Sequence, residues 1–158
     1  MLVNNIIWIF FFAENTAQSQ SMFYARGLRS VVGDNAYNTG DRLIYQTPLH
    51  NPGNNYNSTS GEYTCPTTGV YLFVYSVHGH AIAPGACLTA SLYRGVDFIS
   101  KVYYANELTH RSYLTMSHTD IVYCSSGQKV WIQSDNIMNY IRSFPAQNIF
   151  GGVLLYTL

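Results

Sequence analysis

His78 and His80 are the residues of this sequence whose spacing most directly suggests metal chemistry. They lie two positions apart at the end of an apolar segment, and on one face of a strand two imidazoles could bind zinc or copper. The neighbouring sequence supplies no third ligand, whereas metal sites in proteins carry a complete ligand set. We therefore interpret the pair as polar residues at the edge of a loop, and we assign His110 and His118 to strands or loops.

Cysteine and serine chemistry receives little support. Cys65, Cys87 and Cys124 are an odd number, which permits one disulfide with a remaining thiol, an intermolecular bridge, or three buried thiols. No C-x-x-C pair indicates a zinc ribbon or a thioredoxin-like site. Ser, His and Asp all occur, but no strand–turn–helix elbow sets them out as nucleophile, base and acid. The sequence leaves the cysteine pairing open and predicts a protein that is not an enzyme.

The composition favours a single domain with a large contact surface. The chain has 158 residues, of which 14 are tyrosine and 10% are charged, and its formal net charge is zero. A domain of this length can bury roughly two-thirds of its unfolded surface. A neutral chain lacks the basic face of a nucleic-acid-binding protein, and tyrosine is typical of protein interfaces. We expect an oligomer and no nucleic-acid partner.

Residues 1–20 differ from the remainder of the chain. The apolar run 6–13 is far shorter than the ~20 residues that a helix needs to cross a bilayer. It is similar to the hydrophobic region of a secretory signal peptide, although no Lys or Arg precedes it. The alternative is an ordinary hydrophobic N-terminal extension, such as an added strand. We expect residues 1–20 to be one of these, residues 21–158 to form the domain, the protein to be secreted, and no segment to span a membrane.

The segment 69–77, GVYLFVYSV, predicts the class of fold. Tyr71, Phe73 and Tyr75 lie two residues apart, which places them on one face of a β-strand. Similar short segments are separated by Gly, Pro, Asn and Ser, as in antiparallel sandwiches and jelly rolls. An immunoglobulin sandwich is excluded, because its Trp lies between two cysteines and Trp131 follows all three. We expect strands at 22–28, 42–46, 61–65, 70–77, 86–93, 98–104, 113–124, 129–133 and 149–156.

The spacing of aromatic residues resembles the globular head of complement C1q and its relatives. The family signature is a fixed series of aromatics with one Asn or Asp, closed by Gly-x-Tyr-x-Phe-x-aromatic. Its positions are matched here by Tyr45, Asn51, Tyr56, Tyr63, Gly69, Tyr71, Phe73 and Tyr75. Tyr45 and Tyr63 stand where the family usually has Phe. The segments MFYA (22–25), GQKVWIQ (127–133) and FGGVLLY (150–156) resemble flanking strands of the family, with Gln128 in place of Asp, so the resemblance covers residues 22–158.

The resemblance implies an all-β, ten-stranded jelly-roll sandwich of two five-stranded antiparallel sheets, C1q/TNF-like, assembled as a homotrimer. The aromatics expected to pack the core and the trimer are Phe23, Tyr45, Tyr56, Tyr63, Tyr71, Phe73, Tyr75, Phe150 and Tyr156. Some heads of this family bind calcium through loop oxygens, and Asp135, Asn136 and Asn139 could supply such ligands. Calcium is the one cofactor suggested.

The resemblance also implies a function. We expect a secreted, non-catalytic, trimeric recognition module that binds microbial or cell-surface ligands, with a lectin-like role in innate immunity. Its ligand would be a glycan, a microbial surface or a protein receptor. Three copies that bind together would combine weak individual contacts into a higher overall affinity. The alternatives are a cytokine- or synaptic-organiser-like ligand for a cell-surface receptor, and a structural assembly module.

Polar loops are the expected contact segments. They comprise residues 51–61, 80–86, 105–112 and 135–148. Tyr140 and Arg142 are the candidate ligand contacts, because they can stack on or hydrogen-bond a ligand. Asn57 begins an N-glycosylation sequon, Asn57-Ser58-Thr59, which predicts an attached glycan if the chain is secreted.

Overall fold

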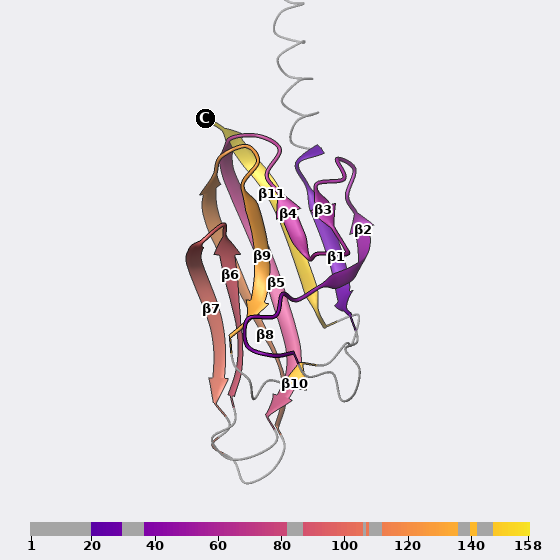
Figure 1. The fold of residues 1–158 in the computed structure, drawn as a ribbon, viewed down its shortest axis with the longest axis vertical. Helices are drawn as coiled ribbons and strands as arrows, with labels where there is room; N and C mark the ends of the chain where they lie inside the picture. The colour runs from indigo at the N-terminus through magenta and orange to yellow at the C-terminus, as the bar shows by residue number, and fades with distance from the viewer. Residues whose placement is uncertain are drawn as a thin grey trace, which may run out of the picture.

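The computed structural model describes residues 20–29, 37–81, 87–105, 107, 112–135, 140–141 and 147–158. These residues form eleven β-strands in two antiparallel sheets that pack face to face (Figure 1). The predicted all-β sandwich is confirmed. The expected signal peptide or extension lies outside the described residues except for Gln20.

The first sheet has the strand order β2 (Tyr45–His50), β1 (Phe23–Leu28), β11 (Ile149–Thr157), β5 (Gly69–Ala81) and β8 (Ser112–Cys124). A short strand, β10 (Tyr140–Ile141), pairs with Gly79 and His80 of β5, whereas β11 pairs with residues 69–76. Because β8 occupies the opposite edge of β5 along its whole length, β10 and β11 share one position. This sheet is therefore five strands wide.

The second sheet has the order β3 (Tyr56–Asn57), β4 (Glu62–Thr64), β9 (Lys129–Ser134), β6 (Cys87–Arg94) and β7 (Asp97–Ala105). Arg42 adds an isolated bridge to Gln133 of β9. The prediction of two five-stranded antiparallel sheets is thus confirmed.

Some strand boundaries expected from the sequence are wrong. The strand expected at 42–46 begins at Tyr45 and runs to His50, because its pairing with β1 starts with Leu28 opposite Tyr45. Only Tyr45 is buried in β2, so this strand carries no alternating signal. β5 continues to Ala81 because β8 pairs with it that far. The two-residue strands β3 and β10 are defined by their partners and are not foreseen by the pattern.

The core between the sheets contains eight of the nine aromatics that the resemblance singles out. Phe23 lies between Tyr56 and Tyr63, with ring centroids 5.0 and 4.4 Å away, and Phe150 meets its edge at 4.9 Å. Each ring adds a large buried area and favourable stacked or edge contacts. The eight are at most 3% exposed: Phe23, Tyr45, Tyr56, Tyr63, Tyr71, Phe73, Tyr75 and Phe150.

The two tyrosines that replace the family's usual phenylalanine find partners for their hydroxyl groups. The Tyr63 hydroxyl donates to the carbonyl oxygen of Ser21 at 2.7 Å, and that of Tyr45 to the carbonyl oxygen of Ser76 at 3.3 Å. Burial raises the pKa of both tyrosines well above the ordinary value. Because both hydroxyls are hydrogen-bonded, the protein avoids the cost of a buried unsatisfied polar group.

Tyr156 is the ninth aromatic, and it does not lie in the core of the single chain. Its side chain is 56% exposed. The pairing of β11 with β5 shifts register between Leu154 and Tyr156. Such an irregularity reverses which face a residue occupies, so Tyr156 joins the outer face of the first sheet.

Candidate functional site

The outer face of the first sheet, opposite the core, is apolar. Residues directly opposite each other in antiparallel strands point to the same side of the sheet. Leu72 lies opposite Val153 and Ile121, and Val70 lies opposite Tyr156 and Tyr123. Val74 and Tyr24 each lie opposite Gly151. We call the following eight residues the apolar face: Tyr24, Val70, Leu72, Val74, Ile121, Tyr123, Val153 and Tyr156.

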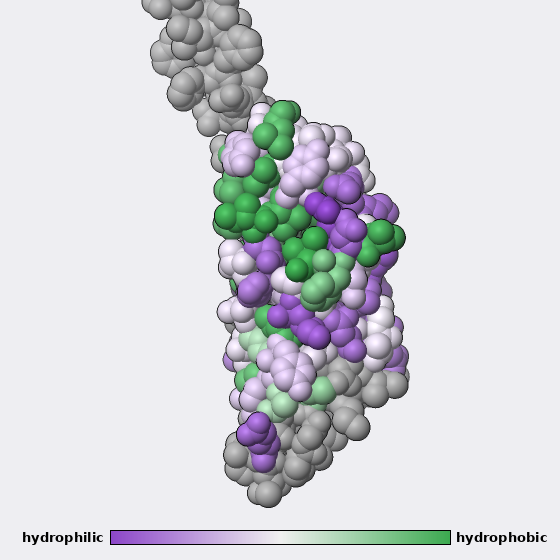
Figure 2. All heavy atoms as spheres, turned by 90° about the vertical axis from the view of Figure 1, so that its left-hand side faces the viewer, coloured by the Kyte–Doolittle hydropathy of each residue, from purple (hydrophilic) through white to green (hydrophobic). Residues whose placement is uncertain are grey.

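This face is open in the single chain. Ile121, Tyr156 and Tyr123 are 69%, 56% and 46% exposed. In the side view of Figure 2, hydrophobic residues gather at the upper left of the described surface. A contiguous apolar patch on a protein surface is typical of an interaction site.

The outer side of β5 is not among the sites predicted from the sequence, although the residue pattern of this strand indicates it. Val70, Leu72 and Val74 alternate with the buried aromatics, so the strand begins with a continuous apolar run. Such a run is typical of a strand covered on both sides. One side of β5 packs in the core, and the other has no cover within the described chain.

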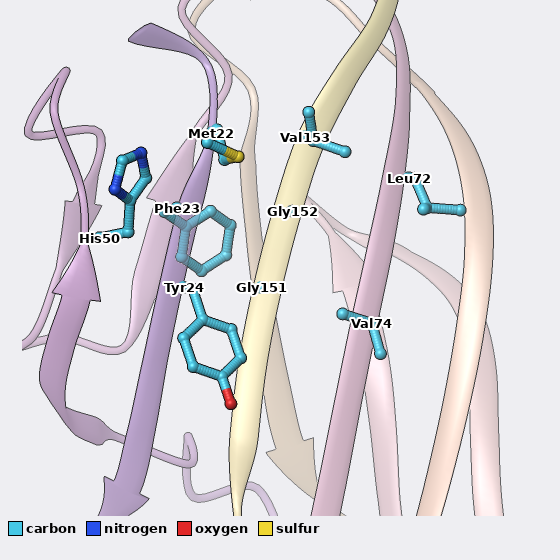
Figure 3. A pocket seen from close by; sticks show the side chains of 9 residues that line it. All are labelled: Met22, Phe23, Tyr24, His50, Leu72, Val74, Gly151, Gly152 and Val153. Carbon is cyan, nitrogen blue, oxygen red and sulfur yellow. The ribbon is translucent and has the colours of Figure 1, made fainter. Parts of the chain in front are cut away.

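A hollow of about 230 Å³ lies within the apolar face (Figure 3). Gly151 forms part of its floor between Tyr24 and Val74, and the absence of a side chain there leaves room. The neighbouring Gly152 faces the other way, since a Cβ atom on it would lie 2.6 Å from Cδ1 of Phe73. The residues lining the hollow are Met22, Phe23, Tyr24, His50, Leu72, Val74, Gly151, Gly152 and Val153. It can accept an apolar side chain.

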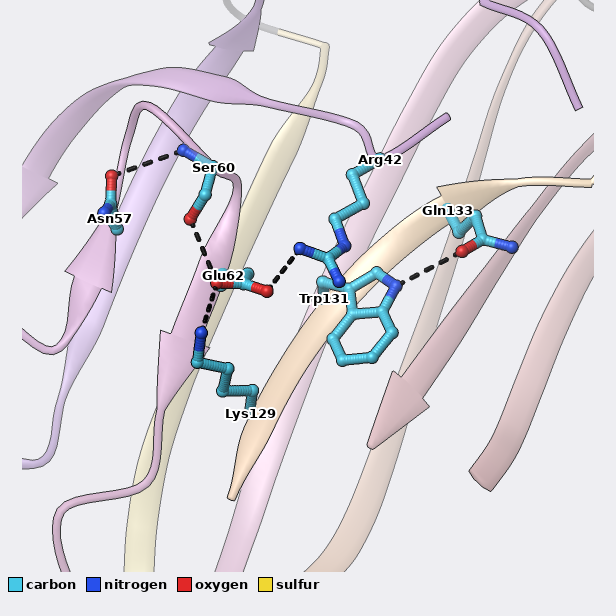
Figure 4. A network of polar contacts seen from close by, with 7 residues as sticks. All are labelled: Arg42, Asn57, Ser60, Glu62, Lys129, Trp131 and Gln133. Carbon is cyan, nitrogen blue, oxygen red and sulfur yellow. Dashed lines mark hydrogen bonds and ion pairs between the residues drawn. The ribbon is translucent and has the colours of Figure 1, made fainter. Parts of the chain in front are cut away.

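A polar network centred on Glu62 lies on the second sheet (Figure 4). The Glu62 carboxylate forms an ion pair with Arg42, accepts a hydrogen bond from Lys129 Nζ at 2.9 Å, and accepts another from the Ser60 hydroxyl. Burial alone would raise the pKa of Glu62, but the hydrogen bond from Lys129 and the two positive charges lower it. The two cations hold this carboxylate in its charged form, which makes it a weak general base.

Aromatic stacking continues this network across the second sheet. The Arg42 guanidinium lies 4.3 Å from the centre of the Trp131 ring, in a cation–π contact. Tyr93 stacks on Trp131 at 6.0 Å, and Phe98 meets Tyr93 edge-on. These planar groups contact one another across β9, β6 and β7, strands that are already paired through their backbones.

Three of the four predicted contact loops leave the sandwich at one end, whereas the fourth, 51–61, follows His50, which lies opposite Tyr24 at the other end. Ser112 lies opposite Ala81, and Cys87 lies opposite Ala105. Tyr140 pairs with His80 at the same end of β5. The strand ends that flank the segments 80–86, 105–112 and 135–148 therefore meet at the lower end of the molecule in Figure 1. We call this the loop end.

The structure places the individual site candidates as follows. Of Tyr140 the backbone is described, in β10, and Arg142 lies outside the described residues, as do Asn136 and Asn139. Asp135 is half-buried, and its carboxylate accepts a hydrogen bond from the Ser91 hydroxyl. Calcium binding therefore stays a prediction.

Asn57 is exposed at the end of β3, on a tight turn. Its side-chain oxygen accepts hydrogen bonds from the amides of Thr59 at 2.8 Å and Ser60 at 3.3 Å. This arrangement leaves the side chain on the surface, where a glycan has space, and glycosylation stays a prediction.

Of the histidine pair, the structure describes the side chain of His78, whereas for His80 it describes the backbone alone. His78 is buried, and its Nδ1 lies 2.9 Å from the Thr115 hydroxyl. Within the ranges that the structure describes, no group of three or more His, Cys, Asp or Glu side chains could hold a metal ion. Nor does any helix among these residues have the length and apolar character needed to cross a membrane.

Comparison with known proteins decides the family. A sequence model described as the C1q domain matches residues 29–155. The chain belongs to the C1q domain family. It is 26% identical over 116 residues to protein HP-25 homolog 2 from Bos taurus, covering 72% of this chain and 50% of that protein. It is 28% identical over 108 residues to a complement C1q subcomponent from Homo sapiens, covering 68% and 41%. The chain thus spans half or less of the length of these curated relatives.

Solved structures share the fold of this C1q domain. The globular domain of a zebrafish complement 1qA protein matches with a TM-score of 0.63 at 18% identity, covering 87% of this chain and 99% of that one. Eiger TNF from S. frugiperda matches with a TM-score of 0.67 at 11% identity, covering 87% and 93%. Murine APRIL matches at 0.64 and 14%, covering 85% and 98%. The fold is therefore that of the C1q/TNF-like jelly roll.

Proposed function

We propose that this C1q domain works as a homotrimer whose subunits cover one another's apolar face. C1q/TNF-like domains form trimers, and the observation that carries the proposal for this chain is the second, uncovered apolar side of β5. Burying one large apolar side chain contributes about 1.5–3 kcal/mol. Ile121, Tyr123 and Tyr156 would contribute most, because they are the most exposed members of the face. The four valine and leucine members are already half-buried and would add less to offset the roughly 4–15 kcal/mol of motional freedom lost on association.

The trimer would act as a non-catalytic recognition module. Assembly brings three copies of the loop end together, so that weak contacts of each copy add as intramolecular events. The proposed ligands are microbial or cell-surface glycans or proteins, in a secreted, innate-immune setting. Similarity to the human complement C1q subcomponent supports this choice over other settings. Tyr140, Arg142 and a calcium ion at Asp135 would contribute contacts there.

A signalling ligand for one cell-surface receptor is the second candidate. It is favoured by 26% identity over 117 residues to complement C1q tumor necrosis factor-related protein 7 from Mus musculus, covering 72% of this chain and 38% of that protein. A receptor ligand would bind one protein tightly and no saccharide.

A matched pair of variants on a glycan array tests the recognition proposal. Ile121→Asp places a charge in the apolar face, whereas Val96→Asp makes the same change in the β6–β7 turn, where Val96 is 97% exposed. We expect wild type and Val96→Asp to bind one saccharide class, and Ile121→Asp to lose most of this binding with its avidity. Adding a chelator tests calcium in the same experiment. Silence of all three proteins on the array, with binding to a single receptor protein, would favour the signalling ligand instead.

A further inference from the structure

Two of the three cysteines meet in the core at the end of the sandwich opposite the loop end. Cys65 follows β4 in the second sheet, and Cys124 ends β8 in the first, opposite Gly69 of β5. Both side chains are fully buried. Their thiols are in hydrogen-bonding contact with each other. Cys87, by contrast, is half-buried at the start of β6, opposite Ala105.

Backbone contacts hold the two cysteines in place. The Cys65 amide donates to the carbonyl oxygen of Gln128 at 2.8 Å, and the Gly127 amide donates to the carbonyl oxygen of Cys65 at 2.8 Å. The Ser126 amide donates to the Thr68 hydroxyl at 3.0 Å. These bonds clamp the segment after β4 onto the turn after β8. A disulfide requires two Cβ atoms about 3.8 Å apart with a fixed mutual orientation, and these flanking hydrogen bonds restrict how far the two cysteines can move apart.

We propose that Cys65 and Cys124 form a disulfide that joins the two sheets when the chain folds in an oxidising environment, and that Cys87 takes no part in it. Each thiol gives up its proton, and the pair gives up two electrons as the S–S bond forms. A small-molecule disulfide such as oxidised glutathione accepts the electrons and protons, and it leaves as two thiols. This pairing decides among the three arrangements that the sequence leaves open.

Burial determines when the bond forms. The thiolate is the attacking species in disulfide exchange, and full burial keeps both sulfur atoms away from reagents in solution. A mixed disulfide with glutathione also has no space around two fully buried side chains. Oxidation therefore precedes closure of the core, and in the folded protein the bond resists reductants.

Peptide mapping of the full chain tests the pairing. We would unfold and refold it in a glutathione redox buffer, alkylate the remaining thiols, and digest with trypsin and chymotrypsin. Cleavage after Tyr63, Tyr71, Tyr123 and Lys129 separates all three cysteines. The expected product is residues 64–71 joined to residues 124–129, in wild type and in Cys87→Ser alike. A Cys65–Cys87 peptide in wild type, or alkylation of both remaining thiols in Cys87→Ser, would overturn the proposal.

Thermal unfolding provides a second measurement, and its main comparison leaves both core cysteines in place. A cross-link that closes a loop of about 60 residues should raise the Tm of oxidised Cys87→Ser by about 10 °C over its fully reduced form. The reduced form is prepared by refolding the chain in reductant. Cys65→Ala/Cys124→Ala should show no difference between the two preparations. Equal Tm values for oxidised and reduced Cys87→Ser would contradict the cross-link.

Discussion

Adjacent glycines of β11 allow the two faces of the first sheet to be tested separately. A Cβ atom at position 152 would lie 2.6 and 2.7 Å from the ring of Phe73 and 2.8 Å from that of Phe23. Both rings are buried and stacked against other aromatics, so neither can move aside freely. Overpacking of this kind typically costs about 1–3 kcal/mol. Replacing Gly by Ala also restricts the unfolded chain, which stabilises the folded state by about 0.4–1 kcal/mol.

We therefore expect Gly152→Ala to lower the free energy of unfolding by about 1.5 kcal/mol, or about 5 °C in Tm. At position 151 the nearest atoms are the Phe23 carbonyl oxygen at 3.2 Å and Tyr24 Cδ2 at 3.3 Å. These contacts are tight but tolerable, and restricting the unfolded chain offsets their cost. We therefore expect Gly151→Ala to leave the free energy of unfolding of the single chain nearly unchanged.

Urea and thermal unfolding at one protein concentration provide the comparison, because assembly adds concentration-dependent stability. Gly151→Ala is the matched control, since it makes the same substitution one residue away on the opposite face. Wild-type stability for Gly152→Ala, or equal losses for both variants, would refute the assignment of Gly152 to the core and Gly151 to the outer hollow.

Two further predictions concern ionisable groups. The pKa of Glu62 in the folded state lies below its ordinary value of 4.5, so its contribution to stability is full above pH 4.5 and is lost as the pH falls through the folded-state pKa. Glu62→Gln should cost about 1 kcal/mol at neutral pH, with a difference from wild type that shrinks below pH 4.5 in urea unfolding; a pH-independent difference would contradict the ion-pair network. Burial raises the pKa of Tyr37, Tyr71 and Tyr75 from 10.0 to about 12, so their contribution to stability is lost as the pH rises from 10 towards 12. In an ultraviolet titration these tyrosines should ionise only with unfolding, whereas ionisation of all 14 tyrosines together near pH 10 in a chain with native circular dichroism would contradict their burial.

The strand pattern of the sequence predicts the fold because alternation at two-residue spacing directly reports one buried face. Tyr71, Phe73 and Tyr75 follow this rule, and all three are fully buried. Tyr156 breaks it, because a register shift in β11 reverses its face and no residue type marks such a shift. In β2 the single buried residue, Tyr45, leaves no alternation to detect.

The candidate surfaces are less accessible from sequence because they depend on which strands become neighbours. Leu72 belongs with Ile121 and Val153 only through pairing across three strands. The same applies to Cys65 and Cys124, which come from different sheets and are far apart in the chain. The apolar character of Val70, Leu72 and Val74 is visible in the sequence. That these residues point away from the core becomes clear only when the core-facing side of β5 is known.

The mass of the protein in solution, measured by light scattering at micromolar concentration, tests the central claim most directly. We expect wild type and Val96→Asp to have three times the chain mass, and Ile121→Asp to have the mass of one chain while keeping native circular dichroism. A monomeric wild type, or an Ile121→Asp variant that still forms trimers, would contradict assembly through the apolar face.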